Sequence, residues 1–141
     1  MNVKLLNDRA KLPVYGSDQA AGLDLCTTES VVIPPYHRAL LRTGIAVELP
    51  VGTVGLIWPR SKLAAKYGLD TLAGVVDADF RGELMISVIN HGKKSVELHR
   101  GDKVAQMLVQ PVIRVNPVEV DHLDSTERGS KGINCTDMRM K

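Results

Sequence analysis

Four ionisable side chains alternate along residues 74–83, GVVDADFRGE, as Asp77, Asp79, Arg81 and Glu83. If this stretch were extended, all four would project to one side, because side chains alternate along a strand. Burying charges there is costly unless they pair with each other or bind a ligand. For an isolated D-x-D, an exposed turn between two strands is the simpler explanation. Other features of the chain are needed to choose between a turn and a ligand site.

A second candidate site is the sequence Pro59-Arg60-Ser61 directly before a short predicted helix, residues 61–68. Ser61 can cap that helix and Gly68 can end it. The free N–H groups and partial positive charge of a helix N-terminus, with Arg60 and Ser61 as further donors, favour an anion. The alternative is an ordinary helix cap with a surface arginine.

Two isolated polar residues stand among apolar neighbours in predicted strands. Asp24 lies within AGLDL, where a salt bridge alone would explain it. Gln106 follows the turn GDK and interrupts the apolar run of residues 104–109. A buried amide demands hydrogen-bond partners, which a polyphosphate or another subunit could supply. The four histidines have no metal-ligand spacing and are expected on the surface or in loops.

Composition limits the class of protein that could hold these residues. With 141 residues, 44% apolar and 24% charged, the chain predicts one globular domain. A net charge of +2 gives no indication of a nucleic-acid-binding surface driven by bulk charge, so no nucleic-acid partner is expected. No apolar run approaches a membrane span and the N-terminus lacks a signal pattern, so neither membrane insertion nor secretion is expected. Cys26 and Cys135 are far apart, which fits a reducing compartment.

Short strands separated by Gly, Pro and polar clusters predict an all-β barrel or sandwich, and the 4% aromatic content favours a core of Val, Ile and Leu. Residues 121–141 are polar and contain glycine, and either a disordered tail or a mobile arm that closes over a ligand would explain them. The predicted strands are Val3–Leu6, Gly22–Cys26, Ser30–Ile33, Arg38–Leu49, Thr53–Trp58, Thr71–Val76, Leu84–Asn90, Ser95–Leu98, Val104–Val109 and Val112–Val118.

The ordered set AGLDL, PRS, GVVDADFRGE, GDKVAQM and ERGSKG resembles the five motifs of the trimeric dUTPase family, over about Ala20 to Thr136. The resemblance implies a distorted β-barrel or jelly roll with one short helix, in residues 1–120, and a C-terminal arm, residues 121–141, that closes over a neighbouring active site. It also implies a cytoplasmic homotrimer, or a nuclear one in a eukaryotic or viral setting. Its active sites are shared between subunits, and it uses Mg²⁺ to hydrolyse dUTP to dUMP and pyrophosphate.

The resemblance also implies roles for individual residues. Asp77 is expected to orient and deprotonate the water that attacks the α-phosphorus. Asp24 is expected to contact a metal-bound water as an outer-shell partner of Mg²⁺. Phe80 is expected to pack on the deoxyribose and to exclude a 2′-hydroxyl. The substrate-binding residues are expected to be Arg60, Ser61, Lys62, Leu72, Ala73, Gly74, Val75, Phe80, Gln106, Arg128 and Ile133.

The chain departs from the family pattern at a few of these positions. Lys62 replaces a glycine, and it could help to bind phosphate or could point outward. Phe80 replaces the usual tyrosine and keeps the ring. In the tail, Lys131 replaces a glycine, and Ile133 occupies the position of a phenylalanine that stacks on uracil. The alternatives to an active dUTPase are a dCTP deaminase-like relative, and a nucleotide-binding or regulatory protein that has lost turnover.

Overall fold

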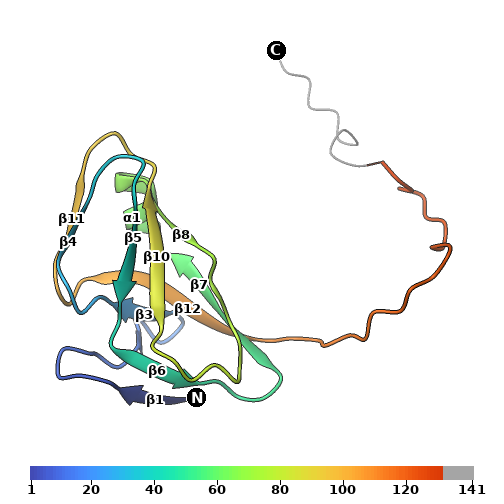
Figure 1. Ribbon diagram of the computed structural model, residues 1–141, viewed down its shortest axis with the longest axis horizontal. Helices are drawn as coiled ribbons and strands as arrows, with labels where there is room; N and C mark the ends of the chain where they lie inside the picture. The colour runs from blue at the N-terminus through green and yellow to red at the C-terminus, as the bar shows by residue number, and fades with distance from the viewer. Residues whose placement is uncertain (132–141) are drawn as a thin grey trace.

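Twelve short strands and one helix make up residues 1–131, the part of the chain that the computed structural model describes (Figure 1). In chain order the elements are β1 (Asn2–Leu5), β2 (Val14–Tyr15), β3 (Leu23–Cys26), β4 (Val31–Ile33), β5 (Arg38–Arg42), β6 (Ile45–Glu48), β7 (Thr53–Pro59), α1 (Ser61–Tyr67), β8 (Leu69–Leu72), β9 (Val75–Val76), β10 (Met85–Asn90), β11 (Val96–Leu98) and β12 (Lys103–Pro111). The predicted all-β fold with one short helix is confirmed.

The strands form four small antiparallel sheets rather than one closed barrel within these residues. The largest has the order β2-β3-β12-β7-β9, and a second has the order β5-β10-β8. The pairs β1-β6 and β11-β4 complete the distorted jelly roll. Because β12 lies between β3 and β7, it brings three segments that are distant in sequence side by side. The helix α1 is seven residues long, and no helix of the described part could cross a membrane.

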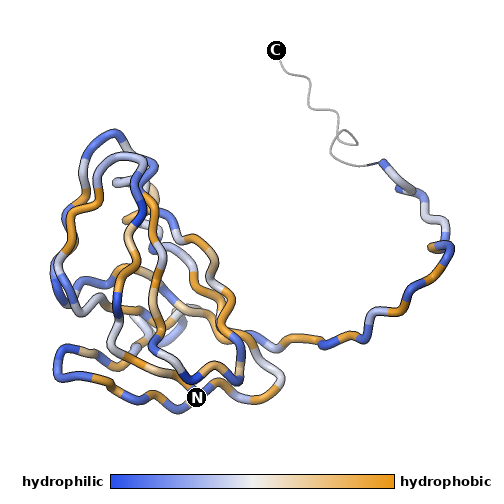
Figure 2. The backbone as a smooth tube through the Cα atoms, in the orientation of Figure 1, coloured by the Kyte–Doolittle hydropathy of each residue, from blue (hydrophilic) through white to orange (hydrophobic). Residues whose placement is uncertain are grey.

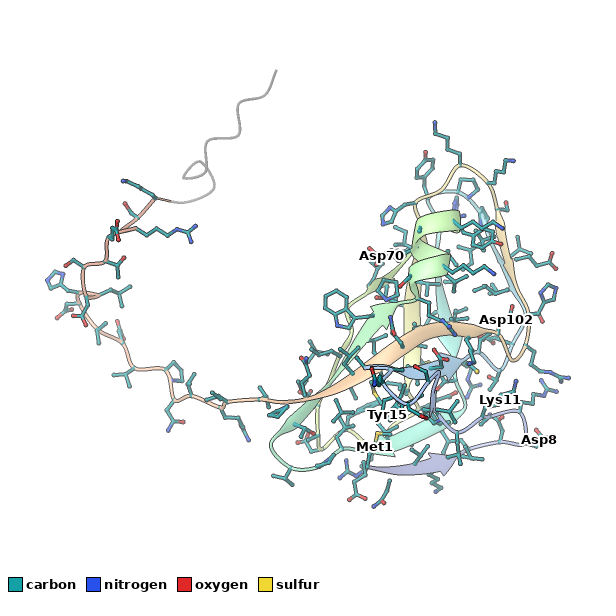
Figure 3. The ribbon with its side chains drawn as sticks, turned by 180° about the vertical axis from the view of Figure 1, so that it is seen from behind. Met1, Asp8, Lys11, Tyr15, Asp70 and Asp102 are labelled. Atoms are coloured by element: carbon teal, nitrogen blue, oxygen red, sulfur yellow. The ribbon has the colours of Figure 1, made fainter. Side chains whose placement is uncertain are left out.

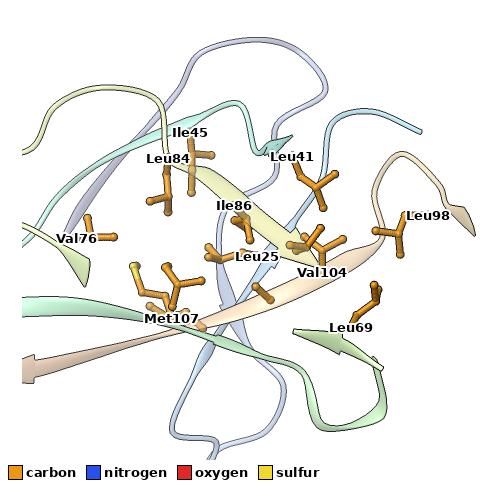
Figure 4. Close-up of a cluster of buried hydrophobic side chains, with 14 of the residues drawn as sticks. Leu25, Leu41, Ile45, Leu69, Val76, Leu84, Ile86, Leu98, Val104 and Met107 are labelled. Carbon is orange, nitrogen blue, oxygen red and sulfur yellow. The ribbon is translucent and has the colours of Figure 1, made fainter. Parts of the chain in front are cut away.

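The interior is built from aliphatic side chains, as the low aromatic content predicts. Leu25 and Met107 from the largest sheet and Ile86 from the β5-β10-β8 sheet are almost completely buried (Figure 4). Hydrophobic stretches follow the strands (Figure 2), and along β10 buried residues alternate with more exposed ones, so that one face of this strand meets the core. Asp70 lies beside α1 at one end of the domain, and Met1 lies at the other end (Figure 3).

Two long predicted strands are each broken into two by residues with positive φ. Arg38–Leu49 divides at Gly44, with φ of +68°, into β5 and β6. Thr71–Val76 divides at Ala73 and Gly74, with φ of +62° and +114°, into β8 and β9. A left-handed residue turns the chain out of an extended path. Apolar runs alone did not reveal these turns.

Other predicted boundaries need correction. Val112–Val118 is not a strand: Val112 donates one hydrogen bond to the carbonyl of Gly52 (2.9 Å), and the segment then runs away from the domain with its side chains exposed (Figure 1). An apolar alternation makes a strand only where a neighbouring strand offers an edge. The two-residue strand β2 was not predicted. Gly68 ends α1 in the left-handed conformation as expected, but the N-cap is Arg60 rather than Ser61.

Candidate functional site

The hairpin between β8 and β9 forms one wall of a cavity of about 330 Å³. Its bend depends on Gly74, whose carbonyl accepts a 2.8 Å hydrogen bond from the N–H of Ile57 on β7. A Cβ on Gly74 would lie 2.8 Å from the carbonyl oxygen of Ile57, so the close approach of the two strands needs glycine. β9 then pairs with β7, which fixes the hairpin against the largest sheet.

Six predicted site residues line this one cavity. They are Leu72, Ala73, Gly74, Val75, Asp77 and Phe80. Asp77 and Phe80 lie in the turn after β9, where the Phe80 N–H donates to the Asp77 carbonyl (3.2 Å). The Phe80 ring lies against Gly82, where a Cβ would come within 2.7 Å of the ring. The cavity therefore presents a carboxylate and an aromatic ring at the open side of an apolar hairpin.

The four alternating charges of GVVDADFRGE do not share one side, because the stretch is a turn and not an extended strand. Arg81 donates to the carbonyls of Ala78 (2.8 Å) and Phe80 (3.0 Å). Glu83 turns towards Arg42 on β5, with Oε2 2.6 Å from Nη2. Arg81 and Glu83 thus hold the turn in place, as scaffolding, and leave Asp77 exposed at the cavity.

A second cluster of polar residues forms where β3, β12 and the end of β7 meet. Asp24 lies opposite Gln106, and Gln106 lies opposite Trp58 in the same row of the sheet. The Asp24 side chain is only 8% exposed and pairs with two cations. Its Oδ1 is 3.1 Å from Arg60 Nη1, and its Oδ2 is 2.7 Å from Lys103 Nζ. Three of the sequence motifs therefore meet around one buried carboxylate.

The sequence did not single out Lys103, although it belongs to the predicted motif GDKVAQ. Its pairing with Asp24 depends on an irregularity in β12 between Lys103 and Ala105, which shifts the register against β3. No local sequence pattern in this strand predicts such a bulge. The salt-bridge explanation of Asp24 is confirmed, with two cations in place of one.

Gln106 finds a hydrogen-bond partner inside its own chain. Its Nε2 donates to the carbonyl of Pro59 (3.0 Å). A polyphosphate or another subunit could supply partners for this amide, and the structure shows that the chain itself supplies one for the amide nitrogen. Its Oε1 points towards Gly22, where a Cβ would lie at 2.7 Å. Gly22 thus leaves the space that the side chain of Gln106 occupies.

Arg60, Ser61 and Lys62 stand at the start of α1, whose first turn contains no acidic residue. Ser61 and Lys62 are exposed. Lys62 lines a hollow of about 400 Å³ together with Arg60 and Lys103, and with the carboxylates of Glu97 and Asp102. Arg60, Ser61 and Lys62 together offer charged and polar donors at the start of α1, an arrangement that suits a polyanion.

The Asp77 cavity and the hollow that contains Arg60 and Lys62 share no lining residue within one chain. The side chains that line the Asp77 cavity, all within residues 1–131, include none of Asp24, Arg60, Ser61 and Gln106. Arg128 lies in the exposed tail, where its Nε donates to the carbonyl of Lys131 (3.3 Å). Ile133 lies outside the described residues.

The thiol of Cys26 is not activated by its position near this cluster. Partial burial is the main cause that raises its pKa, and the nearby amines of Lys11 and Lys103 oppose this effect. A raised pKa disfavours the thiolate, which is the nucleophilic form. The carboxylates and cations, and not the thiol, are the groups that could act on a ligand here.

Comparison with known proteins identifies the arrangement. The sequence model of the dUTPase family matches residues 8–136. The deoxyuridine 5′-triphosphate nucleotidohydrolase of Nocardia farcinica is 52% identical over 133 residues, which are 92% of this chain and 81% of that protein. The protein of the same name from Clostridium tetani is 45% identical over 96% of this chain and 95% of its own length.

Solved structures agree. The dUTPase of Staphylococcus bacteriophage 80alpha with dUpNHpp is 28% identical, covers 96% of each chain and superposes with a TM-score of 0.89. A mutant dUTPase from phage phi11 of S. aureus, described with a structural Mg(II) ion, has a TM-score of 0.81 at 27% identity, over 88% of this chain and 98% of that one. The fold, the ordered motifs and these relatives together show that the chain belongs to the dUTPase family.

Proposed function

We propose that this protein hydrolyses dUTP to dUMP and pyrophosphate, and that Asp77 deprotonates the water that attacks the α-phosphorus. The observation that carries the proposal is the cavity in which Asp77 shares one open wall with the β8–β9 hairpin and Phe80. Phosphoryl transfer depends more on positioning and charge neutralisation than on a strong base, so an exposed carboxylate is suited to it.

The base and the sugar bind in the Asp77 cavity. The backbone of Leu72, Ala73, Gly74 and Val75 offers hydrogen-bonding groups to uracil, and the narrow bend at Gly74 leaves no room for the methyl group of thymine. The ring of Phe80 packs against the deoxyribose and leaves no space for a 2′-hydroxyl. The apolar lining of the cavity supports this assignment.

The triphosphate binds to the cluster around Arg60, Ser61, Lys62 and Gln106. Mg²⁺ usually takes few carboxylates, together with phosphate oxygens and water, so the single carboxylate of Asp24 fits an outer-shell role. When bound, the ion neutralises charge on the phosphate oxygens. Arg60 and Lys103 contact the Asp24 carboxylate at 3.1 and 2.7 Å, and these two contacts keep its side chain in one orientation.

Because the cavity and the phosphate cluster are apart in one chain, a complete site takes them from different copies. A homotrimer forms a closed ring that supplies the cavity and the cluster at every site. Each copy contributes its cavity to the site shared with one neighbour and its cluster to the site shared with the other. The C-terminal arm closes over the site, with Arg128 as a charge-assisted donor to the phosphates and Ile133 against the base.

Pyrophosphate release from dUTP, dTTP, dCTP and UTP tests the proposal. The protein should act on dUTP with strong preference, and Asp77→Asn should keep nucleotide binding but lose orders of magnitude in kcat, because an amide cannot accept the proton. Ammonia release from dCTP would identify a deaminase instead. Binding of dUTP without pyrophosphate release would identify a regulatory protein.

A further inference from the structure

Three loops meet at the end of the domain that carries α1. They are residues 34–38, 66–68 and 90–95, and we call the surface that they form the basic end. The N–H of Tyr36 donates to the carbonyl of Asn90 (2.7 Å), and the N–H of Asn90 donates to the carbonyl of His37 (3.0 Å). The N–H of His91 donates to the carbonyl of Gly68 (2.8 Å). Backbone hydrogen bonds therefore join all three loops.

The side chain of Asn90 fixes the loops from below. It is completely buried, and its Nδ2 donates to the carbonyls of Ile33 (2.9 Å) and Lys94 (2.8 Å). Its Oδ1 accepts from the N–H of Gly92 (2.8 Å). Gly92 in turn lies so close to α1 that a Cβ would come within 2.6 Å of the Tyr67 carbonyl. The basic end is therefore rigid before any ligand arrives.

The charges at this surface have one sign. Arg38, Lys66, Lys93 and Lys94 are exposed there, and residues 34–38, 66–68 and 90–95 contain no Asp or Glu. The exposed imidazoles of His37 and His91 add further donors. The carboxylates nearest along the chain are Asp70 in β8 (Figure 3) and Glu97 in β11, and both lie just outside the three loops. The near-neutral charge of the whole chain conceals this local imbalance.

An aromatic side chain stands among these cations in an unfavourable backbone conformation. Tyr36 has φ of +62° and is 68% exposed. It occupies the third position of the turn Pro34–His37, closed by a 3.2 Å hydrogen bond, where glycine is favoured. A bulky residue with positive φ is rare, and such outliers are retained mainly where they serve a function. The ring of Tyr67, with Lys66 Nζ at 5.3 Å from its centroid, is also exposed.

We propose that the basic end binds single-stranded nucleic acid without sequence preference. Single strands are bound by cations that follow the phosphates and by exposed aromatic rings on which bases stack. The basic end offers both on a preorganised frame. A partner recognised by charge alone, such as an acidic protein surface, would not need an exposed ring in a strained position. The proposal replaces the expectation, based on total charge, that no nucleic acid is bound.

The proposal does not depend on the hydrolysis of dUTP. Tyr67 and Ser95 of the basic end line the hollow that contains Lys62, but Tyr36, Lys93 and Lys94 line neither that hollow nor the Asp77 cavity. Substitutions at these positions should therefore leave dUTP turnover unchanged, so that a loss of nucleic-acid binding and a loss of catalysis can be told apart.

Fluorescence anisotropy with a labelled oligothymidylate of about 16 nucleotides tests the proposal, with the full chain. At physiological salt we expect a Kd of about 1–100 µM, and tighter binding at low salt. Lys93→Gln with Lys94→Gln should weaken binding and reduce the slope of log K against log salt by about 1.4, which is about 0.7 per lost phosphate contact. The matched control is Lys4→Gln with Arg9→Gln, two exposed cations within and just after β1 and outside the basic end, which should change neither quantity.

Tyr36→Gly separates stacking from charge. Glycine accepts positive φ, so the variant should melt at the same or a higher temperature while oligothymidylate binding weakens roughly tenfold. The proposal is overturned if the wild type does not bind the oligonucleotide at low salt, or if the control pair weakens binding as much as the Lys93 and Lys94 pair. It is also overturned if Tyr36→Gly binds as well as the wild type, if polyglutamate binds equally well, or if excess dUMP displaces the oligonucleotide.

Discussion

The Glu83 carboxylate, which follows the Asp77 turn in the chain, forms a salt bridge with the guanidinium of Arg42 on β5. Its Oε2 lies 2.6 Å from Arg42 Nη2 and 3.0 Å from Nε, and its Oε1 accepts a 2.9 Å hydrogen bond from the N–H of Gly44. The Glu83 side chain is 14% exposed. These contacts attach the loop that carries Asp77 and Phe80 to β5, and Glu83 itself lines the Asp77 cavity, so they position the candidate site.

The stability that Glu83 supplies should depend on pH. The hydrogen bond from Arg42 is the main cause that lowers the pKa of Glu83, although burial opposes it. A lowered pKa in the folded state stabilises the protein fully above the ordinary value of 4.5, and this contribution is lost as pH falls through the folded value. Glu83→Gln should therefore cost about 1 kcal/mol at neutral pH.

Urea unfolding of the wild type and of Glu83→Gln across acidic pH checks this prediction. The difference in the free energy of unfolding should shrink once the pH falls below the ordinary pKa of a glutamate. A difference that stays constant down to the lowest pH would show that the carboxylate charge does not contribute.

Gly74→Ala should destabilise the protein more than Gly52→Ala. Both glycines have positive φ, of +114° and +80°, but only at Gly74 would the new Cβ meet backbone, at 2.8 Å from the Ile57 carbonyl oxygen. We expect a loss of about 2–3 kcal/mol for Gly74→Ala and of about 1 kcal/mol for the control. Chemical denaturation measures both, and equal losses would show that the close approach of β7 and the hairpin is unimportant.

The sequence revealed the motifs because each is a local combination of unusual residues in strand-like surroundings. It also predicted the helix, since a terminal glycine marks its end. The cavity could not be predicted, because it depends on Gly74 meeting Ile57, a contact between segments that no periodicity links. The same is true of Lys103 and Asp24, whose 2.7 Å pairing depends on a bulge. The cavity and the Lys103–Asp24 pair depend on the register between distant strands and on residues with positive φ, which a local sequence pattern does not reveal.

Gly22→Ala should impair turnover at a modest cost in stability. The new Cβ would lie 2.7 Å from Gln106 Oε1 and 3.0 Å from Gln106 Cβ, so the amide end has to move away and β12 has to shift slightly. Moving the amide breaks the alignment in which it donates to Pro59 (3.0 Å). We expect a higher KM for dUTP and a loss of about 1–2 kcal/mol in the free energy of unfolding, because the contact is overpacked.

Gly16→Ala is the matched control for this change, because its Cβ would lie at an ordinary 3.7 Å from Asp24 Oδ2. Steady-state kinetics and thermal melting of the two variants are then compared. If Gly16→Ala and Gly22→Ala gave the same KM, the position of Gln106 would not matter to the substrate.

Ending the chain at Thr126 should cut kcat/KM heavily but leave the melting temperature unchanged. Residues 112–131 are exposed and run away from the domain, so the described residues that are removed, 127–131, bury little (Figure 1). The loss of Arg128 removes a donor proposed to close on the phosphates. Thermal melting and dUTP kinetics measure the two effects. A truncated protein as active as the full chain would show that the arm plays no part in turnover.

The most direct test of the account mixes two inactive variants, Asp77→Asn and Arg60→Gln, unfolded together and refolded in equal amounts. If each site takes Asp77 from one copy and Arg60 from another, random trimers should contain about a quarter of their sites with both native residues, and dUTP hydrolysis should reappear at about that fraction. Each variant alone should remain inactive under the same treatment. A mixture as inactive as its two components would contradict the shared site, because both residues would then have to act within one chain.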